Sequence, residues 1–121
     1  MIDHIGIHVS NYHRGKDFYA AALSPLGYKV IAEYGDTAGL GAHGDPDLWI
    51  SEGKPAKPKV HVAFRCDKRA MVDKFYTAAL KAGGKDNGPP GVREDYAPDY
   101  YAAFVIDPDG NNIEAVCHTA K

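Results

Sequence analysis

The pattern of apolar and polar residues at the N-terminus predicts a strand followed by a helix. Residues 2–9 alternate with period two, so one face of the strand is apolar and the other carries His4 and His8. Ser10-Asn11 then offer helix-capping side chains, residues 18–26 place apolar side chains at helical spacing, and Gly27 closes the helix.

Three short strands are expected next. Runs of strand-forming residues at 28–34, 38–42 and 47–51 are separated by Gly, Asp and Pro turn signals. The polar segment 52–58 contains two prolines and predicts a linker. The first half of the chain therefore reads as a βαβββ unit.

The same order of elements begins again after the linker. Residues 59–66 alternate like a strand, and residues 71–80 carry the apolar stripe of a helix that Asp67 can cap. Residues 88–98 are rich in Gly and Pro and predict a loop.

A hairpin is predicted at the end of the chain. Strands are expected at 100–106 and 112–118, on either side of Asp107-Pro108-Asp109-Gly110. Proline presets one φ angle and glycine accepts a positive one, so this tetrapeptide favours a tight turn.

The two halves also share residues. The sequence Phe-Tyr-x-Ala-Ala-Leu at 18–23 recurs at 75–80, and the same offset carries His4 onto His61. Equivalent strands of a duplicated unit can pair about a pseudo-two-fold axis, so their inward residues should converge on a shared cleft. We therefore predict an α+β fold with two tandem βαβββ modules, at about 1–55 and about 58–119.

Length and composition favour one soluble globular domain over residues 1–121, with 45% hydrophobic and 25% charged residues. A net charge of -2 gives no reason to expect a nucleic acid or an acidic membrane as partner. No leader-like or membrane-spanning segment is recognisable, which favours the cytoplasm. Cys66 and Cys117 lie in strand-like runs and are expected to be reduced and buried.

His4, His61 and Glu114 form the candidate metal site. Glu114 interrupts an otherwise apolar strand, where a carboxylate is costly to bury unless it meets a cation. Two imidazoles and a carboxylate can hold one divalent ion and leave coordination positions open for substrate or water. The alternative is that each of the three is an ordinary hydrogen-bonded or solvated residue.

Four segments together resemble the glyoxalase, bleomycin-resistance and extradiol-dioxygenase group, the vicinal oxygen chelate (VOC) superfamily. They are His4-x-Gly-Ile-x-Val-Ser-Asn, the Phe-Tyr helix ending in Leu-Gly-Tyr28, His61-Val-Ala-Phe, and Asp107-Pro-Asp-Gly-Asn-Asn-Ile-Glu114. The resemblance implies paired βαβββ modules whose eight strands form an open cleft, with metal ligands on the first and last strand of each module. It also implies a homodimer, with the metal site shared between subunits in glyoxalases of this kind.

The fourth ligand position departs from the glyoxalase I pattern, which has a second Glu on the last strand of the first module. One register puts Trp49 there, and another puts Glu52 opposite Glu114. We favour Trp49 facing the cleft, because Gly53 and Pro55 place Glu52 at the strand exit.

The remaining two-histidine, one-carboxylate set is also that of non-haem iron dioxygenases. Extradiol enzymes, however, carry a tyrosine three residues before the tight turn, and this chain has Phe104 there. The missing acid/base group favours lyase or isomerase chemistry on an enolisable substrate, with Glu114 as the catalytic base.

Other residues are candidates for lining the substrate cleft. His8 shares the face of His4, and the tyrosines beside the Gly/Pro-rich loop can close over a ligand, whereas Arg93 can hold an acidic group. These candidates are His8, Trp49, Arg93, Tyr100 and Tyr101.

Three functions follow from these observations. The first is a glyoxalase-like enzyme using one divalent ion (Ni, Co, Mn, Zn or Fe) on a small α-oxo or α-hydroxycarbonyl substrate. The second is an Fe(II) ring-cleaving dioxygenase with the same ligands. The third is a metal-free, bleomycin-resistance-like protein that stacks an aromatic drug or metabolite on Trp49 and the tyrosines.

Overall fold

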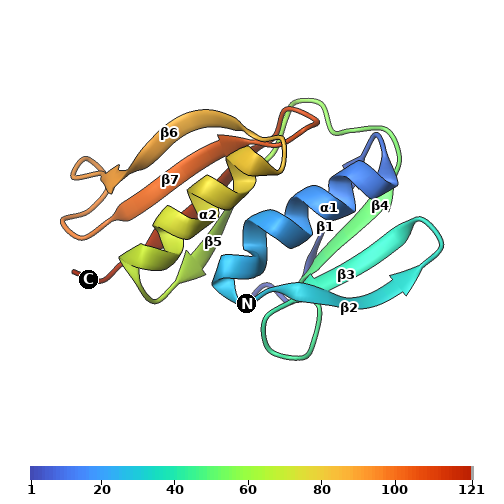
Figure 1. Cartoon of the computed structure of the whole chain (residues 1–121), viewed down its shortest axis with the longest axis horizontal. Coiled ribbons are helices and arrows are strands. Elements are labelled where there is room, and N and C mark those ends of the chain that lie inside the picture. Colours follow the sequence, from blue (N-terminus) through green and yellow to red (C-terminus); the bar gives the residue numbers. More distant parts are fainter. Residues whose placement is uncertain (121) are drawn as a thin grey trace.

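The computed structural model describes residues 1–120 and contains two four-stranded sheets, each with one helix against it (Figure 1). Module 1 contains β1 (Ile5–Val9), α1 (Tyr12–Leu23), the short helix η1 (Ser24–Leu26), β2 (Lys29–Tyr34), β3 (Thr37–Gly41) and β4 (Leu48–Glu52). Module 2 contains β5 (His61–Cys66), α2 (Arg69–Lys81), β6 (Lys85–Val92), β7 (Tyr101–Ile106) and β8 (Asn112–Cys117). The predicted α+β fold of two tandem βαβββ modules is confirmed.

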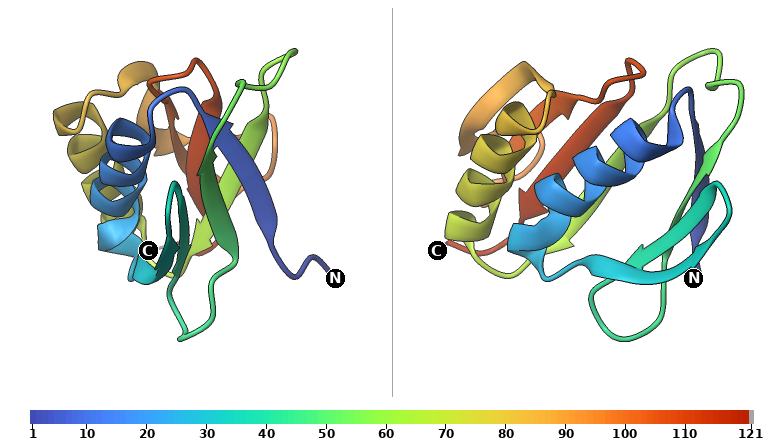
Figure 2. Two further views of the ribbon diagram at one scale, coloured as in Figure 1. Left: turned by 90° about the vertical axis from the view of Figure 1, so that its right-hand side faces the viewer. Right: turned by 45° about the vertical axis from the view of Figure 1, so that its right-hand side comes forward.

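The two sheets have equivalent topologies. Their strand orders are β1-β4-β3-β2 and β5-β8-β7-β6, and the first strand of each module pairs in parallel with the last. Both helices lie on one side of the molecule and the sheets lie on the other (Figure 2). Each sheet therefore has a face covered by helices and a second face, called here the outer face.

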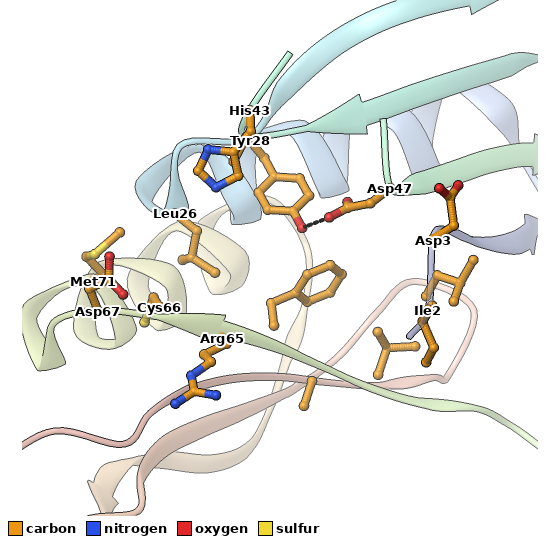
Figure 3. A pocket seen from close by; sticks show the side chains of 15 residues that line it. Ile2, Asp3, Leu26, Tyr28, His43, Asp47, Arg65, Cys66, Asp67 and Met71 are labelled. Atoms are coloured by element: carbon orange, nitrogen blue, oxygen red, sulfur yellow. Dashed lines mark hydrogen bonds between the residues drawn. The ribbon is translucent and has the colours of Figure 1, made fainter. Parts of the chain in front are cut away.

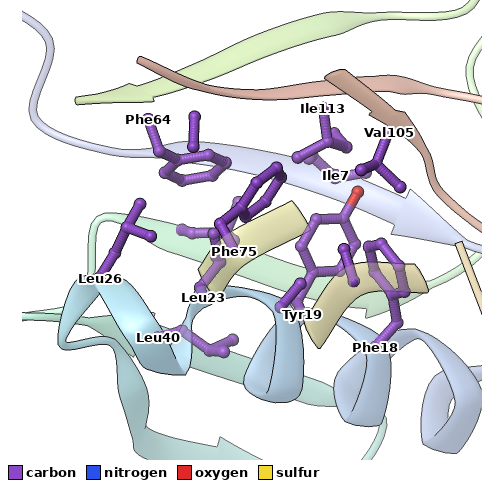
Figure 4. Close-up of a cluster of buried hydrophobic side chains, with 14 of the residues drawn as sticks. Ile7, Phe18, Tyr19, Leu23, Leu26, Leu40, Phe64, Phe75, Val105 and Ile113 are labelled. Carbon is purple, nitrogen blue, oxygen red and sulfur yellow. The ribbon is translucent and has the colours of Figure 1, made fainter. Parts of the chain in front are cut away.

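One hydrophobic core joins the two modules between the helices and the sheets (Figure 4). Phe18 of α1 and Phe75 of α2 are both fully buried in it. Tyr19 is buried too, and its hydroxyl donates a hydrogen bond to Asp107 Oδ2 in the turn between β7 and β8. This bond ties the helix of module 1 to a turn of module 2.

The helix ends differ in how they are capped. The side chain of Asn11 accepts a hydrogen bond from the backbone N–H of Arg14, and Gly27 ends η1 with a φ of 89°. At α2 the N-cap residue is Lys68, which makes no side-chain capping bond, so the expectation that Asp67 caps this helix is wrong.

The Gly/Pro-rich segment differs from the prediction in its first part. Residues 85–92 form β6, although we expected a loop over 88–98. Proline cannot donate to a strand ladder, but β6 is an edge strand, and its register with β7 shifts between Asp86 and Gly88 and between Gly88 and Gly91. An interrupted edge strand tolerates two prolines that a central strand would not.

Among residues 1–120, no helix has the length and apolar character needed to cross a membrane.

Candidate functional site

The candidate site lies on the outer face of module 2, where β5 and β8 run side by side. Glu114 of β8 is opposite Ala63 of β5, and His61 lies two residues before Ala63 and so shares its face. His61 Nε2 is 2.8 Å from Glu114 Oε1. Glu114 is 1% exposed, so its carboxylate needs polar partners within the protein in place of water, and His61 is the first of these. The His61 side chain is 52% exposed and reaches solvent.

Tyr100 supplies the second partner of the Glu114 carboxylate. Its hydroxyl donates a hydrogen bond to Glu114 Oε2. Burial, this hydrogen bond and the negative charge of Glu114 raise the pKa of Tyr100 to about 12. The ring meets the rings of Tyr96 and His118 edge-on, at centroid distances of 5.0 Å and 5.2 Å.

Phe104 and Arg93 lie beside this pair. Phe104 of β7 is the Cα partner of Glu114, and its ring centroid is 6.2 Å from that of His61. The guanidinium of Arg93 lies 5.4 Å from the Phe104 ring centroid, and its Nη2 donates to the carbonyl of Pro89. Arg93 therefore brings a positive charge over Phe104, the Cα partner of Glu114.

Tyr101 lies on the opposite face of the sheet and is not part of this site. Its hydroxyl donates a 2.6 Å hydrogen bond to Asp73 of α2, and its ring lies 5.0 Å from the guanidinium carbon of Arg69. Successive strand residues point to opposite faces, so the sheet separates Tyr101 from Phe104.

His4 does not reach the His61–Glu114 pair within one chain. It is exposed, just before β1, and its Nδ1 lies 2.6 Å from Asp3 Oδ1. Within the described part of the chain, no group of three or more His, Cys, Asp or Glu side chains is arranged to hold a metal ion. His8 is exposed and lines a separate hollow of about 160 Å³ with Lys54.

Trp49 occupies in module 1 the position that Glu114 has in module 2. Glu114 pairs with the residue two places after His61, and Trp49 pairs with Gly6, two places after His4. Trp49 stacks on Tyr34 with an interplanar angle of 20°. It also lies close to Gly39, where an added Cβ would come within 2.9 Å of the indole ring.

Glu52 has a different role. It is the last residue of β4, and its Oε1 accepts a 2.9 Å hydrogen bond from the backbone N–H of Tyr12. Tyr12 is the first residue of α1, so Glu52 satisfies one of the free N–H groups at the start of this helix.

A larger hollow of about 500 Å³ lies between the modules (Figure 3). Leu26, Phe64 and Met71 give it an apolar wall, and Asp47 accepts a hydrogen bond from the Tyr28 hydroxyl there. It is lined by none of the predicted site residues. Neither His61 nor Glu114 therefore lines this hollow.

Sequence reasoning missed the contacts of three aromatic residues. It left Tyr34 unassigned, treated Phe104 only as a missing tyrosine, and placed Tyr100 in the cleft without a link to Glu114. A period-two pattern gives the face of a strand residue but not which loop side chain folds back onto it.

The comparisons with known proteins establish the family. Residues 1–115 match the model of the Glyoxalase/Bleomycin resistance protein/Dioxygenase superfamily, and the chain belongs to this superfamily. The resemblance predicted from the sequence is thereby confirmed. No curated protein matches the sequence significantly.

Solved structures share the fold along nearly the whole chain. A glyoxalase/bleomycin resistance protein from Albidiferax ferrireducens is 25% identical, with a TM-score of 0.82, and the alignment covers 97% of this chain and 98% of that one. A glyoxalase-related enzyme from Fulvimarina pelagi is 16% identical, with a TM-score of 0.73 and coverage of 97% and 87%.

A third structure contains ligands. It is a mutant of the fosfomycin resistance protein FosX from Listeria monocytogenes, complexed with Mn(II) and 1S,2S-dihydroxypropylphosphonic acid. It is 18% identical, with a TM-score of 0.72, and the alignment covers 98% of this chain and 90% of that one. At this identity the likeness shows the fold and not the reaction.

Proposed function

We propose that this protein is a cytoplasmic, homodimeric, divalent-metal-dependent lyase or isomerase. Its substrate would be a small molecule with vicinal oxygens, of the α-oxo or α-hydroxycarbonyl class. The observation that carries the proposal is the buried carboxylate of Glu114 held 2.8 Å from His61 on an otherwise apolar strand. A carboxylate is stable in such a place when it meets a cation or strong donors.

The donor atoms present fit a divalent ion but form only part of a ligand set. One imidazole and one carboxylate from neighbouring strands suit Mn, Fe, Co, Ni or Zn. We propose that His4 of a second copy supplies the third ligand, because His4 is exposed and separate from the other two in its own chain. The unpaired edges of β1 and β5 support association of two copies.

A bound divalent ion would supply Lewis-acid polarisation of two neighbouring oxygens of the substrate. The chain's own residues would do the rest. Glu114 would take up the proton released from the substrate carbon, in a site shielded from water by Phe104 and Tyr100. Arg93 would hold an acidic group of the substrate close to His61.

The first test is metal binding by the purified protein. After reconstitution with Ni(II), Co(II), Mn(II) or Zn(II), we expect about one ion per site, and loss of binding in His61→Ala and Glu114→Gln. His43→Ala is the matched control, because His43 lies on the wall of the hollow between the modules. Absence of metal uptake, or uptake unchanged in His61→Ala, would refute the metal-dependent proposal.

The second test asks whether two chains share the site. His4→Ala and His61→Ala chains, each inactive alone, are mixed under conditions that exchange subunits. A heterodimer then contains one site with all three ligands, so roughly a quarter of the sites in an equal mixture are restored. No recovery of metal binding would contradict a shared site, and a monomer in light scattering would contradict the dimer.

The third test separates this reaction from that of an Fe(II) dioxygenase. We expect turnover of an α-oxo or α-hydroxycarbonyl substrate without oxygen, abolished by Glu114→Gln. Phe104 supports this choice, because it stands where extradiol enzymes carry a tyrosine and its ring can neither donate nor accept a proton; the Tyr100 hydroxyl reaches Glu114 from a different position. Turnover that needs Fe(II) and consumes oxygen would establish the dioxygenase instead.

The stacked pair Trp49 and Tyr34 favours a second candidate function, metal-free binding of an aromatic drug or metabolite. In that case an aromatic ligand quenches Trp49 fluorescence in the presence of a metal chelator, and His61→Ala does not change its affinity.

A further inference from the structure

The loop between β6 and β7 brings a tyrosine hydroxyl onto Glu114. Tyr100 closes this loop, because its carbonyl accepts a 2.7 Å hydrogen bond from Arg93 N–H and its own N–H donates to the carbonyl of Ala97. Tyr96 N–H also bonds within the loop, to the Arg93 carbonyl. The backbone position of Tyr100 is therefore set by the loop itself.

The ring of Tyr100 has contacts of its own. It packs against the small apolar cluster of Ala102, Phe104 and Val116 on the outer face of module 2. The ring also meets those of Tyr96 and His118 edge-on. The hydroxyl thus points at Glu114 before any ligand is present.

The two oxygens of Glu114 have different partners as a result. Oε2 accepts the hydrogen bond from Tyr100, and Oε1 lies 2.8 Å from His61 Nε2. The residue directly opposite Glu114, Phe104, has no polar atom that could take the place of Tyr100. Among the described residues, Tyr100 is the one hydrogen-bond donor to Oε2, whereas the partner of Oε1 is His61.

We propose that Tyr100 is a positioning residue: its hydroxyl holds Glu114 Oε2, so that Oε1 stays directed towards His61 as the oxygen offered to a metal ion. This inference rests on the metal-dependent function proposed above. Groups that hydrogen-bond to a ligand carboxylate orient it, and their removal weakens metal binding about 10- to 100-fold.

The experiment measures Co(II) binding by chelator competition in the full-length wild type and in Tyr100→Phe. The phenylalanine keeps the ring contacts and removes only the hydroxyl. Two matched controls remove a hydroxyl elsewhere. Tyr101→Phe breaks the hydrogen bond to Asp73, and Tyr96→Phe removes the hydroxyl of the neighbouring ring in the same loop but keeps that ring. We expect about 10- to 100-fold weaker binding in Tyr100→Phe and unchanged binding in both controls.

The visible absorption spectrum of bound Co(II) is the second readout. It reports the arrangement of donors around the ion, so we expect it to change in Tyr100→Phe and not in the controls. Thermal unfolding verifies that each variant is folded, and Tyr100→Leu repeats the measurement with a second side chain that lacks the hydroxyl.

The outcomes separate this inference from the proposed function. Wild-type protein that binds no Co(II) would refute both. Wild-type binding with unchanged affinity and spectrum in Tyr100→Phe would overturn only the positioning role. Equal losses of Co(II) affinity in Tyr100→Phe, Tyr101→Phe and Tyr96→Phe would also overturn it, because they would show a general packing effect.

Discussion

The two modules have the same backbone plan but different outer faces. In each, the first strand pairs in parallel with the last, and the other neighbouring strands pair antiparallel, so both sheets are mixed. The helices carry the same Phe-Tyr-x-Ala-Ala-Leu sequence. On the outer face, however, Trp49 of module 1 stands where module 2 has Glu114.

This difference shows which positions the fold constrains. Phe18 and Phe75 point into the shared core, where close packing penalises a change of volume. Trp49 and Glu114 lie on the face away from the helices, where the backbone plan accepts either an indole or a carboxylate. The duplicated modules could therefore keep their cores and still present different chemistry on their outer faces.

The equivalent tyrosines show a second asymmetry. Tyr19 bonds to Asp107 across the boundary between the modules, and burial and the charge of Asp107 raise its pKa well above the usual value. Tyr76 is only partly buried; this burial, a hydrogen bond to Asp86 and the charge of Asp86 raise its pKa, but less than that of Tyr19. One tyrosine joins the two modules, and the other stays within its own.

The largest effect is expected when the shared core is emptied. Phe18→Ala and Phe75→Ala should each lower the free energy of unfolding by about 3–5 kcal/mol, because both rings are fully buried. Urea unfolding measures both values. A loss in one variant that is less than half that in the other would contradict the equivalence of the two core positions.

A smaller and unequal effect is expected at the tyrosines. Tyr19→Phe removes a donor from the buried carboxylate of Asp107 and should cost about 1.5–3 kcal/mol. Tyr76→Phe should change stability far less, because its hydroxyl reaches solvent. The same urea unfolding experiment compares the two variants. Equal losses of unfolding free energy would show that the Tyr19–Asp107 bond contributes no more to stability than the Tyr76 hydroxyl.

A loss of stability smaller than that in Tyr19→Phe is expected at Glu52. Glu52→Ala removes the acceptor for the Tyr12 N–H at the start of α1 and should cost about 0.5–1.5 kcal/mol. Metal affinity should not change, because this carboxylate belongs to the helix end. A loss of metal binding comparable to that in Glu114→Gln would instead make Glu52 the fourth ligand.

Local chemistry explains where the sequence-based prediction of elements was accurate. The period-two strands and the Phe-Tyr helices were placed within a few residues of their observed bounds. The prediction was wrong at 88–92, where Gly and Pro signalled a loop and β6 is found. Proline is excluded from central strands but not from edges, and only the assembled sheet reveals which strand is the edge.

The sequence by itself determined the duplicated βαβββ plan, the superfamily, and the place of Glu114 on an otherwise apolar strand. These features follow from side-chain periodicity and from local turn chemistry, which act over a few residues. Only the tertiary structure decided that His4 stays apart from the expected pair of His61 and Glu114, that Tyr100 folds back onto Glu114, and that Tyr101 faces α2. Those contacts depend on strand register and loop closure, which join residues far apart in the chain and leave no periodic trace in the sequence.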